Sequence, residues 1–301
     1  MGKITEMLNA IDCKKENTDE LYSIFRSVDE HSLPIVRVEL PRSSTFVRQR
    51  PNPCIGAYDS IQELRYPPYL VTGYGRANIP YNPMFYCCAC SNSVSNKETL
   101  LLGTSLLETS KFARDIMGNG IERLTASIWS CDRNLSLVAI PFSDTLKSPC
   151  SEICCVQKQW KSMLKNVEVS PDGLELIEYM SEEISRELKG YEYFKISNFV
   201  YWLLYHNGKT CHADGIIYPS IKSQGECFNI ALKPSVVDEA MSIRDVVECQ
   251  ISKRMLDTKI RVTQYGRMME QKLEFIPKEF CEDEIRFFEK FDFGLNSLVK
   301  L

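Results

Sequence analysis

The sequence predicts an α+β fold, in which strands and helices are mixed rather than repeated as βαβ units. Apolar stretches of strand length recur along the chain, and stretches with helical periodicity interrupt them at irregular intervals. The 301 residues are 44% hydrophobic and 25% charged, which is ordinary for a globular chain that buries a large core. The absence of regular βαβ alternation disfavours a doubly wound parallel sheet.

The first predicted elements are a short helix and two strands. Residues 17–28 predict a helix because Asn17 is a favourable N-cap residue. Residues 35–40 alternate as a strand, and residues 45–50 predict a second one. Residues 51–83 are rich in Pro, Gly, Tyr and Asn, which predicts a long loop of the kind that often carries function.

The next part of the chain predicts a buried strand, a helix and two further strands. The strand at 84–90 is a continuous apolar run, whereas the helix at 100–117 is weakened in its first turn by Gly103. Residues 124–129 and 135–140 again have the pattern of strands.

Two more helices are predicted in the middle of the chain, and short strands follow them. Apolar residues at helical spacing run from Leu174 to Leu188, and Gly190 stands where a glycine commonly follows a helix end. A second helix is expected to begin after a Ser197 cap and to continue through His206. The remaining predicted elements are strands at 215–218 and 228–232, a hairpin or small sheet within 242–275, and a last helix at 282–291.

The charge pattern argues against two classes of function. The 36 basic and 40 acidic side chains give a net charge of −4, and no basic stripe with interleaved aromatic residues suits a nucleic acid. The apolar runs are far shorter than the about 20 residues that span a bilayer. The first residues lack the apolar segment of a secretory signal, and Glu6 breaks the myristoylation motif. We therefore expect a cytoplasmic protein without a membrane partner.

The thirteen cysteines predict reduced thiols rather than disulfides or a metal site. Their number is odd, and a chain of this length does not need covalent staples. Cys87 with Cys90, and Cys150 with Cys154, have spacings that zinc pairs use. However, the first pair lies in the predicted buried strand, where free cysteine is common. We expect no bound metal.

Four segments, in this order along the chain, resemble the motifs of the RES-domain family. They are FVRQR at 46–50, GRANIP at 75–80 continuing to FY at 85–86, TSLLE at 104–108, and GIIYPS at 215–220 followed by NIAL at 229–232. The match covers 46–232 as a RES-like domain with a helical insertion around 150–206. Residues 1–45 are then an N-terminal segment packing on the core, and 233–301 are a C-terminal extension.

The resemblance implies an ADP-ribosyltransferase-like mixed sheet with flanking helices. It also implies an enzyme that cleaves the nicotinamide–ribose bond of NAD by hydrolysis or phosphorolysis, as the toxin of a bacterial toxin–antitoxin pair. NAD is then the substrate rather than a resident cofactor, inorganic phosphate is a potential co-substrate, and an antitoxin protein is the partner. The oligomeric state, a homo-oligomer included, stays open.

The resemblance also assigns the site. Its catalytic residues are Glu108, Arg76 and Ser220, and its substrate-binding residues are Arg48, Tyr86 and Asn78. Nicotinamide leaves as a neutral molecule, so the chemistry requires stabilisation of positive charge on the ribose, which a carboxylate such as Glu108 supplies. Ser220 can form a hydrogen bond near the amide or a phosphate.

The remaining assigned residues suit binding. Arg48 and Arg76, with Arg50 in reserve, can grip the pyrophosphate through their guanidinium groups. The ring of Tyr86 can stack on the cationic nicotinamide. Asn78 belongs to a loop whose residues tolerate unusual backbone conformations.

Several alternatives remain open from the sequence. An inserted stretch at 90–96 separates Tyr86 from Glu108 more widely than in compact family members, so Glu98 is a rival for the catalytic position. Ser105-x-x-Glu108 also fits a helix capping box. The alternative functions are an ADP-ribosyltransferase that modifies a macromolecule and a catalytically silent nucleotide-binding module.

Overall fold

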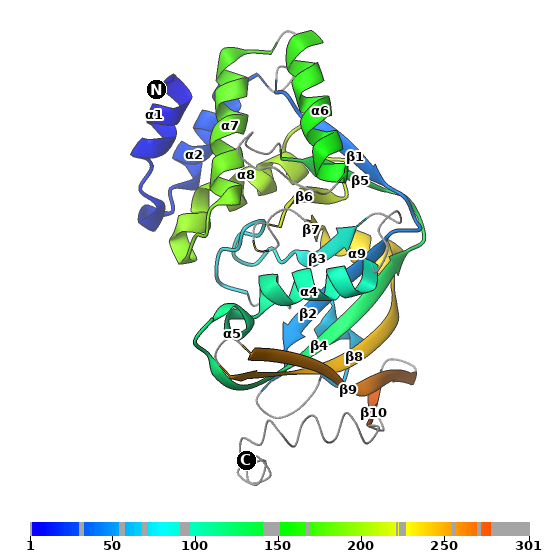
Figure 1. Cartoon of the computed structure of the whole chain (residues 1–301). Helices are drawn as coiled ribbons and strands as arrows, with labels where there is room; N and C mark the ends of the chain where they lie inside the picture. Colours follow the sequence, from blue (N-terminus) through cyan, green and yellow to red (C-terminus); the bar gives the residue numbers. More distant parts are fainter. Residues whose placement is uncertain are drawn as a thin grey trace.

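The computed structural model of the chain describes most of residues 2–277. The described ranges are 2–29, 33–53, 58–67, 71–90, 97–140, 151–166, 169–220, 222, 227–254, 257–269 and 272–277. Within them the fold is mixed α+β, with a large mixed sheet and flanking helices, as the sequence predicted (Figure 1). The predicted last helix at 282–291 lies outside the described residues.

Ten strands within the described ranges form one sheet. They are β1 (Val36–Leu40), β2 (Thr45–Pro51), β3 (Phe85–Cys90), β4 (Asn119–Cys131), β5 (Leu135–Ala139), β6 (Gly215–Pro219), β7 (Phe228–Leu232), β8 (Met241–Arg254), β9 (Asp257–Met269) and β10 (Lys272–Pro277). Their order across the sheet is β1-β5-β6-β7-β3-β2-β4-β8-β9-β10. The β5–β6 pair is parallel, and the other neighbouring pairs are antiparallel.

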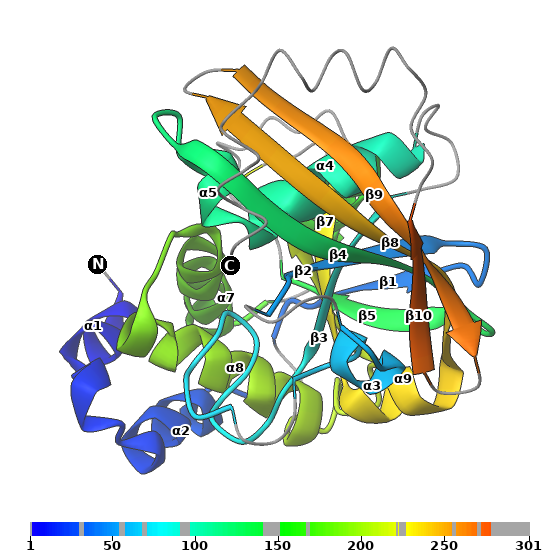
Figure 2. The same cartoon turned by 90° about the horizontal axis from the view of Figure 1, so that it is seen from below.

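The helices flank this sheet. They are α1 (Lys3–Ala10), α2 (Thr18–Ser27), α3 (Ile61–Leu64), α4 (Lys97–Thr109), α5 (Lys111–Arg114), α6 (Ser151–Asn166), α7 (Pro171–Ser185), α8 (Phe194–Tyr205) and α9 (Pro234–Ala240), with 3-10 turns η1 (Cys13–Lys15) and η3 (Gly190–Tyr193). Helices α1, α2, α7 and α8 pack on one another at one end of the molecule (Figure 2). Helix α9 contacts β8, and Ser60, at the start of α3, forms a bridge with Lys272 of β10. Helix α4 contacts β2 and β3. Within the described residues, no helix combines the length and apolarity needed to cross a membrane.

The strand predictions are confirmed within a few residues, and the N-cap prediction is confirmed in detail. Asn17 accepts a hydrogen bond from the backbone N–H of Glu20 at 3.2 Å, at the start of α2. The stretch 242–275, expected as a hairpin or small sheet, instead continues the main sheet. Its first strand, β8, pairs with β4 over the whole length of that strand.

Three helix predictions are wrong in their boundaries. The helix expected at 100–117 begins at Lys97 and ends at Thr109, because Ser110 leaves the helical conformation and caps the next short helix through the Ala113 N–H at 2.8 Å. Ser197 lies inside α8 rather than at its start, and its hydroxyl donates to the Tyr193 carbonyl at 2.7 Å. Gly190 has a positive φ of 52°, but α7 ends before it, at Ser185.

The sheet opens between two of its central strands. Strands β2 and β3 pair only at Thr45–Val47 with 88–90 within the described residues, although β2 stays paired with β4 as far as Pro51. Beyond Val47 the two strands therefore separate. The opening places side chains of β2, β3 and α4 around a common space.

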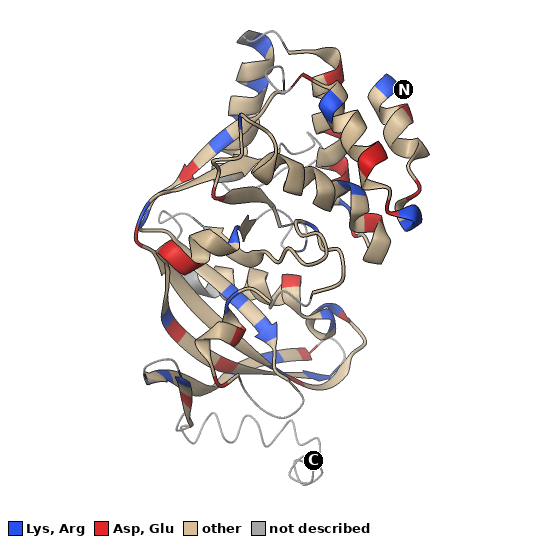
Figure 3. Ribbon diagram, turned by 180° about the vertical axis from the view of Figure 1, so that it is seen from behind, with Lys and Arg blue, Asp and Glu red and all other residues tan. Residues whose placement is uncertain are grey.

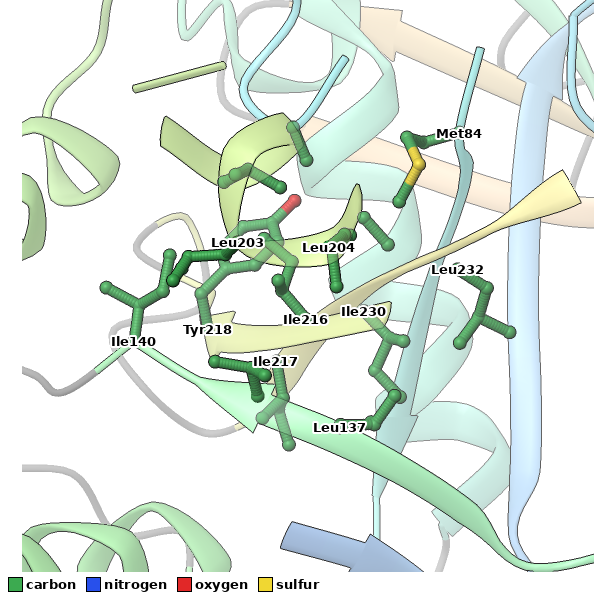
Figure 4. Packing of buried hydrophobic residues seen from close by; sticks show 14 of the residues in the cluster. Met84, Leu137, Ile140, Leu203, Leu204, Ile216, Ile217, Tyr218, Ile230 and Leu232 are labelled. Atoms are coloured by element: carbon green, nitrogen blue, oxygen red, sulfur yellow. The ribbon is translucent and has the colours of Figure 1, made fainter. Parts of the chain in front are cut away.

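A continuous apolar core supports the other half of the sheet. Strands β6 and β7 are buried along their whole length. Figure 4 shows Ile216, Ile217 and Ile230 packed with Leu137 of β5 and Leu203 of α8. Burial of these strands fixes the positions of the polar side chains at their ends.

Candidate functional site

A cavity of about 500 Å³ lies where the sheet opens, beside the last turn of α4. Four of the six predicted site residues line it: Arg48, Arg76, Tyr86 and Glu108. Ser220 reaches the cavity through a hydrogen bond to Glu108, and Asn78 lies behind it in the loop that carries Arg76. The structure thus brings together residues that are far apart in the sequence.

The Glu108 carboxylate is held by two neutral donors. Ser220 Oγ donates to Glu108 Oε1 at 2.6 Å, and Asn229 Nδ2 donates to the same oxygen at 3.0 Å. Both donors come from the ends of buried strands, and Ser220 itself has no exposed surface. In the described part of the chain, Glu108 Oε2 accepts no hydrogen bond, so this oxygen is available to a bound molecule.

A buried thiol fixes the orientation of Asn229. Cys88 Sγ lies 3.2 Å from Asn229 Oδ1 and acts as its donor, which turns the Asn229 amino group toward Glu108. Burial, with the nearby charge of Glu108, raises the pKa of Cys88 well above its ordinary value, so the thiol keeps its proton.

The capping-box interpretation of Glu108 is wrong, because Ser105 lies inside α4 rather than at its N-terminus.

Arg76 is a cation of the cavity whose charge interacts with that of Glu108. Its Nη2 donates to the Arg186 carbonyl at 3.2 Å, and its guanidinium lies 5.8 Å from the centre of the Tyr218 ring. Its Nε–H is buried and has no acceptor among the described residues. Burial alone would lower the pKa of Arg76, but Tyr218, Tyr193 and Glu108 outweigh it and raise the pKa, so the group stays charged.

Arg48 has a different environment from the one expected for a phosphate ligand. Its Nε donates to the Leu64 carbonyl at 3.2 Å and its Nη1 donates to the Tyr86 carbonyl at 2.7 Å. It therefore bridges the opening between β2 and β3 in place of the missing strand pairing. Burial, reinforced by the charge of Arg50, lowers the pKa of Arg48 to about 10. Contact between Arg48 and substrate stays a prediction. Arg50 donates to the Glu63 carbonyl and does not line the cavity.

Tyr86 and Asn78 organise the loop that presents Arg76. The Tyr86 hydroxyl donates to Asn78 Oδ1 at 2.8 Å and accepts from the Ala77 N–H at 2.8 Å. Asn78 Nδ2 donates to the Gly73 carbonyl at 3.2 Å, so both ends of this amide are used inside the loop. A Cβ atom at Gly75 would lie 2.2 Å from Asn78 Oδ1, which explains why this turn requires glycine.

The cavity concentrates positive charge that the whole chain does not have. Among the described residues, its basic side chains are Arg48, Arg76, Lys111, Arg114, Lys189 and Lys222, and its acidic ones are Glu108 and Glu187. Glu187 is paired with Lys222 at 2.7 Å. Elsewhere in the described ribbon, basic and acidic residues are interspersed (Figure 3). Such a lining suits a ligand with more than one negative charge.

Several cavity residues were not found from the sequence. Asn229 had a signal, because an amide within an otherwise apolar strand needs a polar partner. Gln49 had a weaker one, since it shares a strand face with the apolar Val47. Tyr193 and Lys222 had none, because only the tertiary fold brings their segments to the cavity.

The structure describes most of the cysteines and of the other residues that could bind a metal. The described cysteines form no disulfide with one another, and Cys87 and Cys88 are buried whereas Cys155 is exposed. No three His, Cys, Asp or Glu side chains of the described residues converge as a metal site would require. Cys150 and the side chains of Cys90 and Glu98 lie outside the described part, so the rival catalytic position has no described geometry.

Comparison with known proteins adds no family to these observations. The sequence matches no protein-family model, and no curated protein is significantly similar to it.

Proposed function

We propose that the protein binds NAD on an ADP-ribosyltransferase-like fold and cleaves its nicotinamide–ribose bond. One observation carries the proposal. Glu108, a carboxylate bonded through one oxygen only among the described residues, is fixed by Ser220 and Asn229 in a basic cavity that also contains Arg76 and Tyr86. The four sequence segments that resemble the RES-domain family meet at this cavity, which supports the proposal independently.

The proposed chemistry follows from the charge of the substrate. As the bond between nicotinamide and the ribose breaks, its electron pair goes to the ring nitrogen, and nicotinamide leaves without needing a proton. Positive charge then develops on the ribose, where a fixed carboxylate stabilises it most effectively. Because Ser220 and Asn229 hold Glu108 in advance, little reorganisation is needed when the charge develops.

The rest of the cavity accounts for binding in this proposal. The buried Arg76 Nε–H needs an acceptor, and a phosphate oxygen of NAD provides one with a complementary charge. The other basic side chains of the cavity balance the second phosphate charge. The Tyr86 ring offers its face to the cationic nicotinamide, while its hydroxyl stays bound to the loop.

The acceptor that attacks the ribose carbon is water or inorganic phosphate. Water loses a proton and gives ADP-ribose, whereas phosphate gives ADP-ribose 1-phosphate. An enzyme with either activity depletes the NAD of its host, so we further propose that it acts as a toxin restrained by an antitoxin protein. Since the charged side chains that line the cavity are mainly basic, a partner that occludes it would present acidic side chains.

The decisive experiment is incubation of the purified protein with NAD, with and without phosphate, followed by chromatographic identification of the products. Free nicotinamide with soluble ADP-ribose or its phosphate ester supports the proposal. Label from radioactive NAD that stays on a macromolecule indicates a transferase instead. Binding without any product indicates a silent nucleotide-binding module, and absence of binding contradicts the proposal altogether.

A further inference from the structure

Gln49 is a buried polar residue of the cavity that the chemistry above does not use. Its side chain is only 6% exposed and lines the cavity from β2. Its Nε2 donates to the Leu102 carbonyl of α4 at 2.9 Å, which fixes the orientation of the amide. Its Oε1 is buried and accepts no hydrogen bond from the described residues. An unpaired buried amide oxygen is costly, and a molecule in the cavity that supplies an N–H would satisfy it.

The position of Gln49 relative to Tyr86 indicates which part of a ligand supplies that donor. Val47 of β2 is the last residue paired with β3, and its partner is Cys88. The same register, continued into the opening, puts Gln49 across from Tyr86. Side chains two residues apart share a face of the sheet. Gln49 and Tyr86 therefore lie on the face that Cys88 shares, and both line the cavity.

We propose that Gln49 Oε1 accepts a hydrogen bond from the carboxamide amino group of nicotinamide, and that this contact makes the site selective for the amide over the acid. The inference rests on the proposed function, in which the Tyr86 ring stacks on nicotinamide. A ring in that position presents its carboxamide to the side chain opposite Tyr86. Nicotinic acid adenine dinucleotide lacks the N–H and would place a carboxylate against the carbonyl oxygen of Gln49, so it is rejected.

Leu102 makes the selection stringent. Because Nε2 is already bound to the Leu102 carbonyl, the Gln49 amide cannot flip to present a donor to a carboxylate without breaking that bond. The Gln49 backbone carbonyl also accepts from Thr109 Oγ1 at 3.3 Å, which ties this part of β2 to the end of α4. A fixed acceptor discriminates between amide and acid, whereas a freely rotating one does not.

The test compares three dinucleotides on the full-length protein: NAD, nicotinic acid adenine dinucleotide, and nicotinamide hypoxanthine dinucleotide, whose adenine amino group is replaced. We expect the wild type to prefer NAD over the nicotinic acid analogue by at least about tenfold in kcat/KM and to tolerate the hypoxanthine analogue. Gln49→Met should reduce the first ratio by at least about tenfold. Gln264→Met, on β9 outside the cavity, is the matched control and should leave both ratios unchanged.

Three results overturn the inference. The first is equal use of NAD and nicotinic acid adenine dinucleotide by the wild type. The second is a Gln49→Met variant that prefers NAD as strongly as the wild type does. The third is a wild type that discriminates against the hypoxanthine analogue instead, which would assign the donor to adenine. If Gln49→Met does not fold, the wild-type ratios alone decide. Binding of free nicotinamide and nicotinate to the wild type, measured by saturation-transfer NMR, needs no turnover. Preference for nicotinamide there supports the Gln49 contact even if NAD cleavage fails, and equal binding contradicts it.

Discussion

Ser220 Oγ lies 2.6 Å from Glu108 Oε1, although the two residues are 112 positions apart in the sequence. One comes from the last turn of α4 and the other follows β6, so their contact joins a helix to the far side of the sheet opening. Asn229 on β7 adds a second donor to the same oxygen. The carboxylate is therefore placed by the fold as a whole and not by its own helix.

Replacing Glu108 by glutamine should leave the protein folded and remove most of its NAD cleavage. Glutamine keeps the shape of the side chain but loses the charge, and removal of one aimed electrostatic group costs roughly 100-fold or more in rate. Nicotinamide release under single-turnover conditions measures the effect. Glu178→Gln, on the exposed side of α7, is the matched control. Loss of activity in Glu98→Gln with retention in Glu108→Gln would show that the motif has been assigned to the wrong glutamate.

Arg48 and Arg76, two of the arginines that line the cavity, should show different defects when they are replaced by alanine. Arg76→Ala should weaken NAD binding by about 1.5–3 kcal/mol without unfolding the protein, because it removes a charge-assisted contact with the ligand. Arg76→Lys should restore only part of it, since lysine lacks the planar fork. NAD titration calorimetry measures both variants, and wild-type affinity in Arg76→Ala would exclude this arginine from the binding site.

Arg48→Ala should instead lower the free energy of unfolding by about 2–4 kcal/mol, because it leaves the carbonyls of Leu64 and Tyr86 without their donor. Urea denaturation measures this loss. An Arg48→Ala variant that keeps full stability but loses NAD affinity would show that Arg48 contacts the substrate directly, as the sequence resemblance implies.

The sequence predicted the α+β class and most strands because each strand carries a local signal. The continuous burial of β6 and β7, for example, appears in the sequence as runs of mostly apolar residues, with Asn229 of β7 as a polar exception. The end of α4 was missed because Ser110 is compatible with helix in general. Only its bond to the Ala113 N–H shows that it ends one helix and caps the next.

The sequence could predict which residues lie together at the cavity but not the contacts that each of them makes. Segment resemblance placed Glu108, Ser220 and Arg76 together, and the structure describes that proximity. It could not show that the Asn78 amide is used within its own loop, nor that Arg48 is occupied by two carbonyls. Those facts depend on where strands β2 and β3 separate, which is a property of tertiary structure.

Native-state alkylation should distinguish the cysteines. Burial raises the pKa of Cys87 and Cys88 above the ordinary value, so both thiols stay protonated and unreactive at neutral and mildly alkaline pH. Cys155 is exposed and should react first. Peptide mass spectrometry after brief iodoacetamide treatment measures the order. Rapid modification of Cys88 would indicate that the opening between β2 and β3 admits solvent.

Elemental analysis with about one zinc per chain would contradict the expectation of reduced, metal-free thiols.

The Asn229→Asp substitution tests whether a neutral donor beside Glu108 is essential. The amide nitrogen lies 3.0 Å from Glu108 Oε1, so the introduced carboxylate would stand against an existing one. Two carboxylates this close do not both ionise easily, so the pair keeps a shared proton to higher pH than a single carboxyl group does. Since the proposed chemistry needs negative charge at Glu108, turnover of the variant should be low at neutral pH and rise as pH increases and the shared proton is lost.

The wild type should show no such rise over the same range, and Asn229→Ala should be impaired at every pH because it removes the donor without adding a titrating group. Initial rates of nicotinamide release across pH 5–9, at saturating NAD, compare the three proteins. A variant with the wild-type pH profile would show that Asn229 does not face the working carboxylate during the reaction.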